Sequence, residues 1–371
     1  MKNPLEKKIC PYCMNVISKK SVKYFCDCGK EAVRIGFPKK LQCTDENCTS
    51  RRYRMTCPYD ACKSELPTGI LDYNGYLRFS LIGLSGAGKS NFLTAMIHEM
   101  RLNSTGRWVI SHMNPDTFEA YRRNEEKMFT HHEPVPATRR GSIIPQQWSI
   151  SDTQNSFLGK MPVYSLTIFD GAGEDEKSVE PVIANCIQGS KTLVILFDPL
   201  SIRQLENSMD KNIYHWSTSS NPNEYPDAMI TSLTNYIRNC LQLPPSQKIK
   251  KDVAVVFTKI DTLKKDFENS VVMQESPHIK AGGFVEQDSI EVDNQIRSWL
   301  KKNGQDAFLG VINKDFYPER VRFFGVSSIG NPPVAERTFG VITPHRVLDP
   351  LMWMMYRENI IPEKTKQLEG K

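Results

Sequence analysis

One segment constrains the fold of this 371-residue chain more than any other, because a strand, a glycine-rich loop and a helix follow one another directly. Residues 76–83 read YLRFSLIG, an alternating β-rich run, and G-L-S-G-A-G-K-S occupies 83–90. The following NFLTAMIHEMRL has its apolar residues at helical spacing, namely Phe92, Leu93, Met96, Ile97 and Met100. This order predicts a phosphate-binding loop between a strand and a helix.

The composition of the loop is typical of phosphate binding. Its glycines permit backbone angles that turn successive N–H groups towards phosphate oxygens, and the helix N-terminus adds its positive end. We expect Lys89 to reach the β- and γ-phosphates and to act in catalysis, and the Ser90 hydroxyl to ligate Mg²⁺. The predicted phosphate-binding residues are Gly83, Ser85, Gly86, Ala87, Gly88, Lys89, Ser90 and Asn91.

Three later apolar runs each end in polar residues. They are VYSLTIFD at 163–170, KDVAVVF at 251–257 and VRFFGV at 321–326. Their polar ends are Asp170, the T-K-x-D pattern of Thr258, Lys259 and Asp261, and the pair Ser327 and Ser328. A carboxylate at a strand end opposite a phosphate loop holds Mg²⁺, so Asp170 is a predicted metal ligand.

Together these segments resemble the Ras-like P-loop GTPases of the TRAFAC class, over roughly residues 75–360. The resemblance implies that Asp261 accepts hydrogen bonds from guanine and that the Lys259 stem covers the base. Thr258 replaces the commoner Asn as an accepted variant. The Ser327–Ser328 turn resembles the loop whose backbone N–H meets the guanine O6, and an ordinary strand-end turn is the alternative.

The same resemblance implies two switch segments that contact the γ-phosphate. In D-G-A-G-E, at 170–174, Gly173 would offer its N–H to this phosphate. Thr138 is the predicted first-switch threonine, with Thr130 and an ordinary loop threonine as alternatives. Glu174 stands where many relatives carry Gln, and it cannot donate an amide hydrogen to the phosphate. We therefore expect slow intrinsic hydrolysis that a partner accelerates.

A narrower resemblance is to the double-GTPase proteins of bacterial conflict systems. The shared features are a Cys-rich N-terminus, the D-x-A-G-E switch, a strand ending in F-D-P at 197–199 and DPLMW at 349–353. This resemblance implies a role in antiviral defence.

Eight of the ten cysteines lie before residue 63, in four close pairs. The pairs are Cys10 and Cys13, Cys26 and Cys28, Cys43 and Cys48, and Cys57 and Cys62. Close pairs present two thiolates to one metal, so eight cysteines predict two structural Zn²⁺ sites that stabilise a module with few large apolar residues. The simplest assignment places the first and second pairs on one zinc, and the third and fourth pairs on the other. An interleaved assignment, first with third and second with fourth, stays open.

The N-terminal residues MKNPLEKKIC lack the apolar core of a secretory signal, and no run approaches a membrane span. We therefore expect a cytoplasmic protein with reduced thiols. The change in cysteine content predicts a zinc-ribbon-like module over 1–72 and a GTPase domain with insertions over 73–371.

The chain carries a formal charge of +6, all of it within residues 1–72. Nucleic acid is a possible partner through Lys39, Lys40, Arg51, Arg52 and Arg54, but a solvated basic face is the favoured interpretation. Two all-cysteine zinc sites would add a charge of about −4, which removes most of this excess.

The predicted domain is long for a compact nucleotide-binding fold. The extra length at 103–160, 200–228 and 262–318 is interpreted as insertions that offer surfaces to protein partners. A helix is predicted over 286–303 with Ile290, Ile296, Trp299 and Leu300 facing inward.

The predicted fold is thus α/β, a mostly parallel sheet with helices on both faces, preceded by the two-zinc module. The predicted function is Mg²⁺-dependent hydrolysis of GTP to GDP and phosphate in a nucleotide-dependent switch. The alternatives are a GTP-gated adaptor with little hydrolysis, an ATPase, and a nucleic-acid-binding zinc protein.

Overall fold

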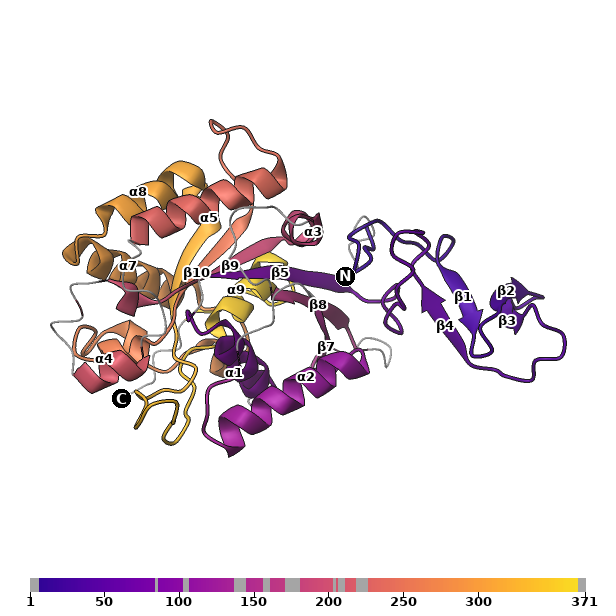
Figure 1. The fold of residues 1–371 in the computed structure, drawn as a ribbon, viewed down its shortest axis with the longest axis horizontal. Helices are drawn as coiled ribbons and strands as arrows, with labels where there is room; N and C mark the ends of the chain where they lie inside the picture. The colour runs from indigo at the N-terminus through magenta and orange to yellow at the C-terminus, as the bar shows by residue number, and fades with distance from the viewer. Residues whose placement is uncertain are drawn as a thin grey trace.

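The computed structural model describes residues 7–83, 86–102, 107–136, 145–155, 161–170, 181–202, 205, 211–217 and 226–365. These residues form a small N-terminal sheet and a large sheet covered by helices. Figure 1 shows the small sheet projecting from one side of the large one.

The small sheet has four short antiparallel strands. They are β1 (Lys23–Cys26), β2 (Glu31–Ile35), β3 (Lys40–Cys43) and β4 (Tyr53–Thr56), in the order β3-β2-β1-β4. Beside this sheet lies a minor apolar core that includes Ile17, Leu66, Ile70 and Tyr76. Tyr76 belongs to the first strand of the large sheet, so this core joins the two sheets.

The large sheet has seven strands in the order β11-β10-β9-β5-β8-β7-β6. The strands are β5 (Gly75–Gly83), β6 (Trp108–His112), β7 (Gln146–Asp152), β8 (Val163–Asp170), β9 (Thr192–Phe197), β10 (Asp252–Phe257) and β11 (Val321–Gly325). The five strands from β11 to β8 pair in parallel, whereas β7 and β6 are antiparallel. The predicted α/β fold with a mostly parallel sheet is therefore confirmed.

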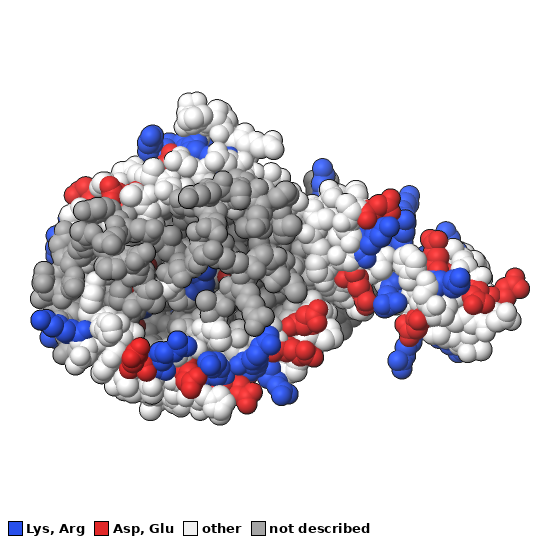
Figure 2. All heavy atoms as spheres, in the orientation of Figure 1, with Lys and Arg blue, Asp and Glu red and all other residues white. Residues whose placement is uncertain are grey.

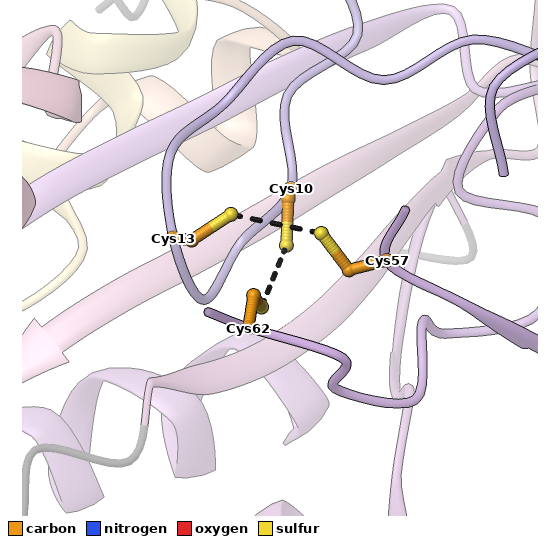
Figure 3. A group of neighbouring side chains, drawn as sticks. All are labelled: Cys10, Cys13, Cys57 and Cys62. Atoms are coloured by element: carbon orange, nitrogen blue, oxygen red, sulfur yellow. Dashed lines mark hydrogen bonds between the residues drawn. The ribbon is translucent and has the colours of Figure 1, made fainter. Parts of the chain in front are cut away.

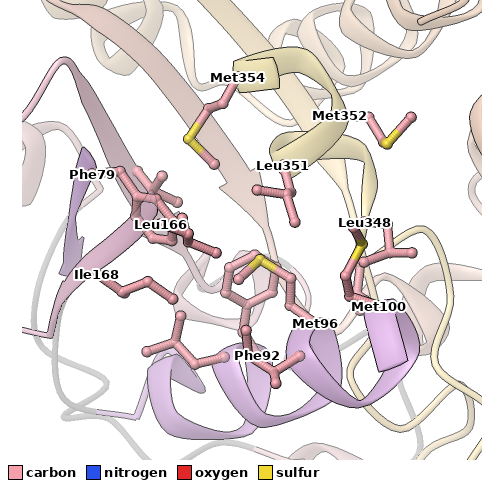
Figure 4. Close-up of a cluster of buried hydrophobic side chains, with 14 of the residues drawn as sticks. Phe79, Phe92, Met96, Met100, Leu166, Ile168, Leu348, Leu351, Met352 and Met354 are labelled. Atoms are coloured by element: carbon pink, nitrogen blue, oxygen red, sulfur yellow. The ribbon is translucent and has the colours of Figure 1, made fainter. Parts of the chain in front are cut away.

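Helices cover both faces of this sheet, because its central strands are apolar on both sides. The helices are α1 (Lys89–Leu102), α2 (Pro115–Glu125) with a π-helical turn (Glu126–Thr130), α3 (Pro181–Gly189), α4 (Lys211–Ser217), α5 (Pro226–Leu241), α6 (His278–Ala281), α7 (Glu286–Lys302), α8 (Asp306–Asp315) and α9 (Asp349–Arg357). In β9, Val194 and Leu196 face the core with α1, α2 and α9, whereas Leu193, Ile195 and Phe197 face the core with α5, α7 and α8. Figure 4 shows the first of these cores, with α1 and α9 side chains packed over β5 and β8.

Described parts of the extra length belong to the large sheet and to the helices that cover it. Residues 108–112 and 146–152 extend the sheet as β6 and β7, and α7 packs on β11. The helix predicted over 286–303 is confirmed, but Ile290 is 37% exposed and its inward orientation was wrong. Val292 is buried instead, because it shares a helix face with Ile296 and Trp299.

Every helix within the described residues is too short or too polar to cross a membrane. The domain boundary at residue 72 stays a prediction, and the minor core that includes Tyr76 extends beyond it.

Candidate functional site

Four sequence-predicted segments meet at one edge of the large sheet. The strands β8, β5, β9, β10 and β11 are parallel neighbours, so their carboxyl ends share this edge. The glycine-rich loop follows β5, and Asp170 ends β8 opposite Leu81 of β5. Thr258 follows β10 and Ser327 lies two residues beyond β11. The fold therefore brings the predicted loops together.

The described glycines of the glycine-rich loop have backbone angles expected of a phosphate loop. Gly86 and Gly88 have φ of 80° and 81°, angles that residues with a Cβ adopt only with strain. A Cβ on Gly83 would lie 3.0 Å from the Leu196 carbonyl oxygen, so close packing against β9 also requires glycine there. The Lys89 ammonium folds over the loop and donates to the Gly83 carbonyl at 2.5 Å. The Lys89 ammonium and the left-handed glycines therefore both lie at the start of α1, where a phosphate would bind.

Lys259 connects the T-K-x-D segment to the glycine-rich loop. Its ammonium donates to the Gly86 carbonyl at 3.0 Å and to Asp198 Oδ2 at 2.5 Å. Its own backbone is left-handed, with φ of 54°. Asp198, which directly follows β9, is 5% exposed and also accepts the Leu200 N–H at 3.0 Å. The ion pair therefore joins the ends of β9 and β10 to the loop after β5.

Sequence reasoning assigned no role to Asp198, although it noted the F-D-P run that contains it. The available signal was an aspartate placed directly after an apolar strand, as Asp170 is. Thr258 strengthens the same junction, because its N–H and its hydroxyl both donate to the Phe197 carbonyl, at 3.0 and 3.3 Å.

Asp261 is a buried carboxylate beside the Ser327 turn. Burial raises the pKa of Asp261, while a hydrogen bond with Ser327 acts in the opposite direction. Its Oδ1 is buried and has no hydrogen-bond partner among the described residues. A buried acceptor without a donor costs about 1–3 kcal/mol. A ligand that brings N–H donors to Asp261 would recover this cost.

Both the hydroxyl and the backbone N–H of Ser327 take part in hydrogen bonds. Its hydroxyl oxygen accepts the N–H groups of Ile329 and Gly330, at 3.3 and 2.7 Å. Its own N–H donates to the His345 carbonyl at 3.0 Å, so this N–H is already engaged. Ser328, the second predicted serine, is half-buried at the same turn.

Several predicted residues lie outside the described part of the chain, namely Ser85, Thr138, Gly173 and Glu174. Thr130, the alternative to Thr138, ends the π-helical turn after α2. The Asn91 side chain accepts the Val135 N–H at 2.9 Å, which ties α1 to the segment leading to Thr138.

The first cysteine cluster contains Cys10, Cys13, Cys57 and Cys62. Their sulfur atoms lie within 4.8 Å of one another, and Figure 3 shows the four side chains converging. The Cys10–Cys62 and Cys13–Cys57 sulfur distances are 3.9 and 3.6 Å. A tetrahedral Zn²⁺ with bonds of about 2.3 Å separates its sulfurs by about 3.8 Å, so the four thiols fit zinc. Burial raises the pKa of the Cys10 thiol, and a bound metal would reverse this by stabilising the thiolate.

The second cluster contains Cys26, Cys28, Cys43 and Cys48, and its geometry is similar. The Cys26–Cys48 and Cys28–Cys43 sulfur distances are both 3.5 Å. Both assignments considered from sequence were therefore wrong, because the pairs are nested, first with fourth and second with third. The cause is strand pairing, since β1 pairs with both β2 and β4 and brings distant turns together.

Of the basic residues proposed as a nucleic-acid footprint, two lie on opposite edges of the small sheet. Lys40 lies in β3 and Arg54 in β4, which are the two edge strands of the small sheet. Three strand spacings separate these edges by about 14 Å. Figure 2 shows both positive and negative side chains on the visible face of this module.

Comparisons with known proteins add two weak structural similarities. No protein-family model matches the chain, and a search of curated proteins finds no match. The chain resembles the S. cerevisiae Ski7 GTPase-like domain bound to GTP, with a TM-score of 0.34 and 14% identity over 78% of this chain. The same domain bound to GDP and inorganic phosphate gives a TM-score of 0.35 and 14% identity. The chain spans about half of those solved chains, since the match covers 51% of their length.

Proposed function

We propose that this protein binds GTP with Mg²⁺, hydrolyses it to GDP and phosphate, and acts as a nucleotide-dependent switch. The main support is the junction at Lys259, which holds the T-K-x-D segment against the glycine-rich loop. A single ligand that spans this junction would carry phosphates at one end and a base at the other.

The base end of the site favours guanine. Asp261 is buried with Oδ1 lacking a partner among the described residues, so it would accept N–H donors from a base. Guanine offers two neighbouring donors, N1–H and the exocyclic amine, whereas adenine has no proton on N1. The half-buried Ser328 turn lies beside Asp261 and would offer a backbone N–H to the guanine O6.

The phosphate end of the site has ligands for Mg²⁺. The Ser90 hydroxyl and the Asp170 carboxylate offer oxygen ligands, which Mg²⁺ prefers. Ser90 is in the first turn of α1, and Asp170 ends β8, the strand that pairs with β5. When bound, Mg²⁺ would neutralise charge on the β- and γ-phosphates. Lys89 would add a second positive charge on the same oxygens.

The hydrolytic step rests on residues outside the described part of the chain. Water would attack the γ-phosphorus, and the bond to the β,γ-bridging oxygen would break with GDP leaving. We infer that Glu174 orients this water, that Gly173 and Thr138 contact the γ-phosphate, and that the intrinsic rate is slow. Release of these contacts on cleavage would alter the surface offered to a protein partner. The resemblance to double-GTPase proteins is the basis for proposing a role in bacterial defence.

The proposal is tested by identifying the nucleotide that co-purifies with the full chain and by single-turnover hydrolysis with Mg²⁺. We expect GDP or GTP in the protein, and slow conversion of GTP that a Glu174→Gln variant accelerates. Co-purified ATP would contradict the guanine assignment. Bound GTP that is never hydrolysed would favour the GTP-gated adaptor. A slower Glu174→Gln variant would refute the inference that glutamate at this position limits the intrinsic rate.

A further inference from the structure

A cavity lies at the edge of the large sheet that is opposite the candidate nucleotide site. Its volume is about 540 Å³. Its lining includes Arg78, Lys191, Lys250, Lys251, Asp252 and Arg320. Most of these lie at the amino ends of β5, β9, β10 and β11. Arg78 is five residues before Gly83 on β5, which places the cavity roughly 17 Å from the glycine-rich loop.

One wall of the cavity belongs to the first cysteine cluster. Ile9 and Met14 flank Cys10 and Cys13, and Met14 packs on Gly189 at the end of α3. A Cβ on Gly189 would lie 2.4 Å from the Met14 sulfur, so only glycine permits this contact. Figure 1 shows α3 and the start of β5 beside the N-terminal segment. The cavity is therefore built jointly by the zinc-binding segment and the sheet.

The cavity lining is strongly basic. Five of its side chains are cations and two are carboxylates, a formal excess of three positive charges. Both carboxylates are in ion pairs. Glu358 pairs with Lys191, and Asp252 accepts from Arg320 at 2.9 Å and from Arg357. Each of these carboxylates is therefore neutralised by a neighbouring cation, and the lining keeps its positive excess.

Lys251 is one of the cations that line the cavity. Its ammonium donates to the backbone carbonyls of Gln188 and Ser190, at 2.8 and 2.5 Å, which fixes it at the carboxyl end of α3. Burial, together with the nearby charge of Arg78, lowers the pKa of Lys251 to about 8. An anion in the cavity would oppose both effects.

We propose that this cavity binds a small soluble ligand that carries one or more phosphate groups. A formal excess of three charges matches a phosphate or pyrophosphate group better than a single carboxylate, and Arg78 supplies a planar guanidinium for two oxygens. A volume of about 540 Å³ leaves room for a ligand larger than the phosphate group itself. Because its walls come from the zinc-binding segment and from α3, the ligand would hold these two elements together.

Inorganic pyrophosphate, titrated calorimetrically into the zinc-loaded full chain, tests this site. The titration is done in a Lys89→Ala background, which weakens phosphate binding at the glycine-rich loop. We expect pyrophosphate to bind this protein, and Lys250→Glu to weaken the binding by roughly tenfold or more. Lys250 is an exposed lining residue, so its replacement should not affect folding. Lys301→Glu, an exposed change on α7 outside the lining, is the matched control.

Absence of pyrophosphate binding in the Lys89→Ala protein would overturn the proposal. Equal weakening by Lys250→Glu and Lys301→Glu would also overturn it, since this would indicate general attraction by surface charge. Pyrophosphate should in addition raise the pKa of Lys251, measured by NMR on ¹³C-methylated lysines and assigned with Lys251→Arg. None of these results depends on guanine nucleotide binding, so the outcome is independent of the function proposed above.

Discussion

Arg346 is the residue whose replacement should reveal most about how the Ser327 turn of the candidate site is stabilised. Its side chain is fully buried and pairs with Asp288 and, at 2.7 Å, with Asp349. It also donates to the Val271 and Gln274 carbonyls, each at 3.1 Å. His345, its neighbour, exchanges two backbone hydrogen bonds with Ser327, at 2.8 and 3.0 Å. Arg346 thereby anchors the segment that holds the Ser327 turn.

Replacing Arg346 by Met should lower the free energy of unfolding by about 3–5 kcal/mol, because it leaves two buried carboxylates without a cation. This is a large share of the roughly 5–15 kcal/mol that stabilises a typical domain. Burial opposes ionisation of Asp349, yet the Arg346 charge holds its pKa below the usual range. Burial raises the pKa of Asp288. Without Arg346 both pKa values should rise, so protonation at low pH should relieve part of the damage.

Urea unfolding followed by tryptophan fluorescence measures this effect at about pH 7.5 and about pH 5. The loss of stability relative to the parent should be smaller at the lower pH, and adding Asp288→Asn should restore part of it. Lys280→Met is the control, because it removes an exposed ion pair with Glu275 and should leave stability unchanged. An Arg346→Met protein as stable as the parent, or equally destabilised at both pH values, would refute the reasoning.

Two further predictions concern the metal centres and the nucleotide site. Combined Cys10→Ser and Cys57→Ser should remove one of two zinc ions, measured by elemental analysis, because both residues belong to one cluster. Loss of both zinc ions would contradict this nested grouping. Asp198→Asn keeps an acceptor for the Leu200 N–H but removes the charge that faces Lys259. It should weaken GTP binding by roughly tenfold, measured with a fluorescent guanine nucleotide, and an unchanged affinity would show that the ion pair does not organise the site.

Local sequence patterns were sufficient to predict which strand ends form the candidate site. Apolar runs predicted β5, β8, β10 and β11, and the polar residues after them predicted which side chains would meet at the sheet edge. These predictions succeed because parallel strands align their carboxyl ends whatever their separation in sequence.

Contacts between distant segments were not predictable in this way. The nested cysteine clusters depend on the pairing of β1 with β4, about 30 residues apart, which spacing within each pair does not encode. The Arg346 network joins residues 58 positions apart, and each member alone is an ordinary charged residue. Ile290 is a different case, because helical spacing alone separates it from Ile296 by about 120° around the helix axis, and only its apolar character suggested an inward position.

The central claim is that Asp261 recognises guanine, and comparing base preference in the parent and in Asp261→Asn tests it most directly. Affinities for GTP, ATP and xanthosine triphosphate are measured with Mg²⁺ on both proteins. The parent should prefer GTP, and the variant should prefer the xanthine nucleotide, because an amide pairs with the carbonyl that replaces the guanine amine. Tight ATP binding by the parent, or an unchanged preference in the variant, would contradict the claim.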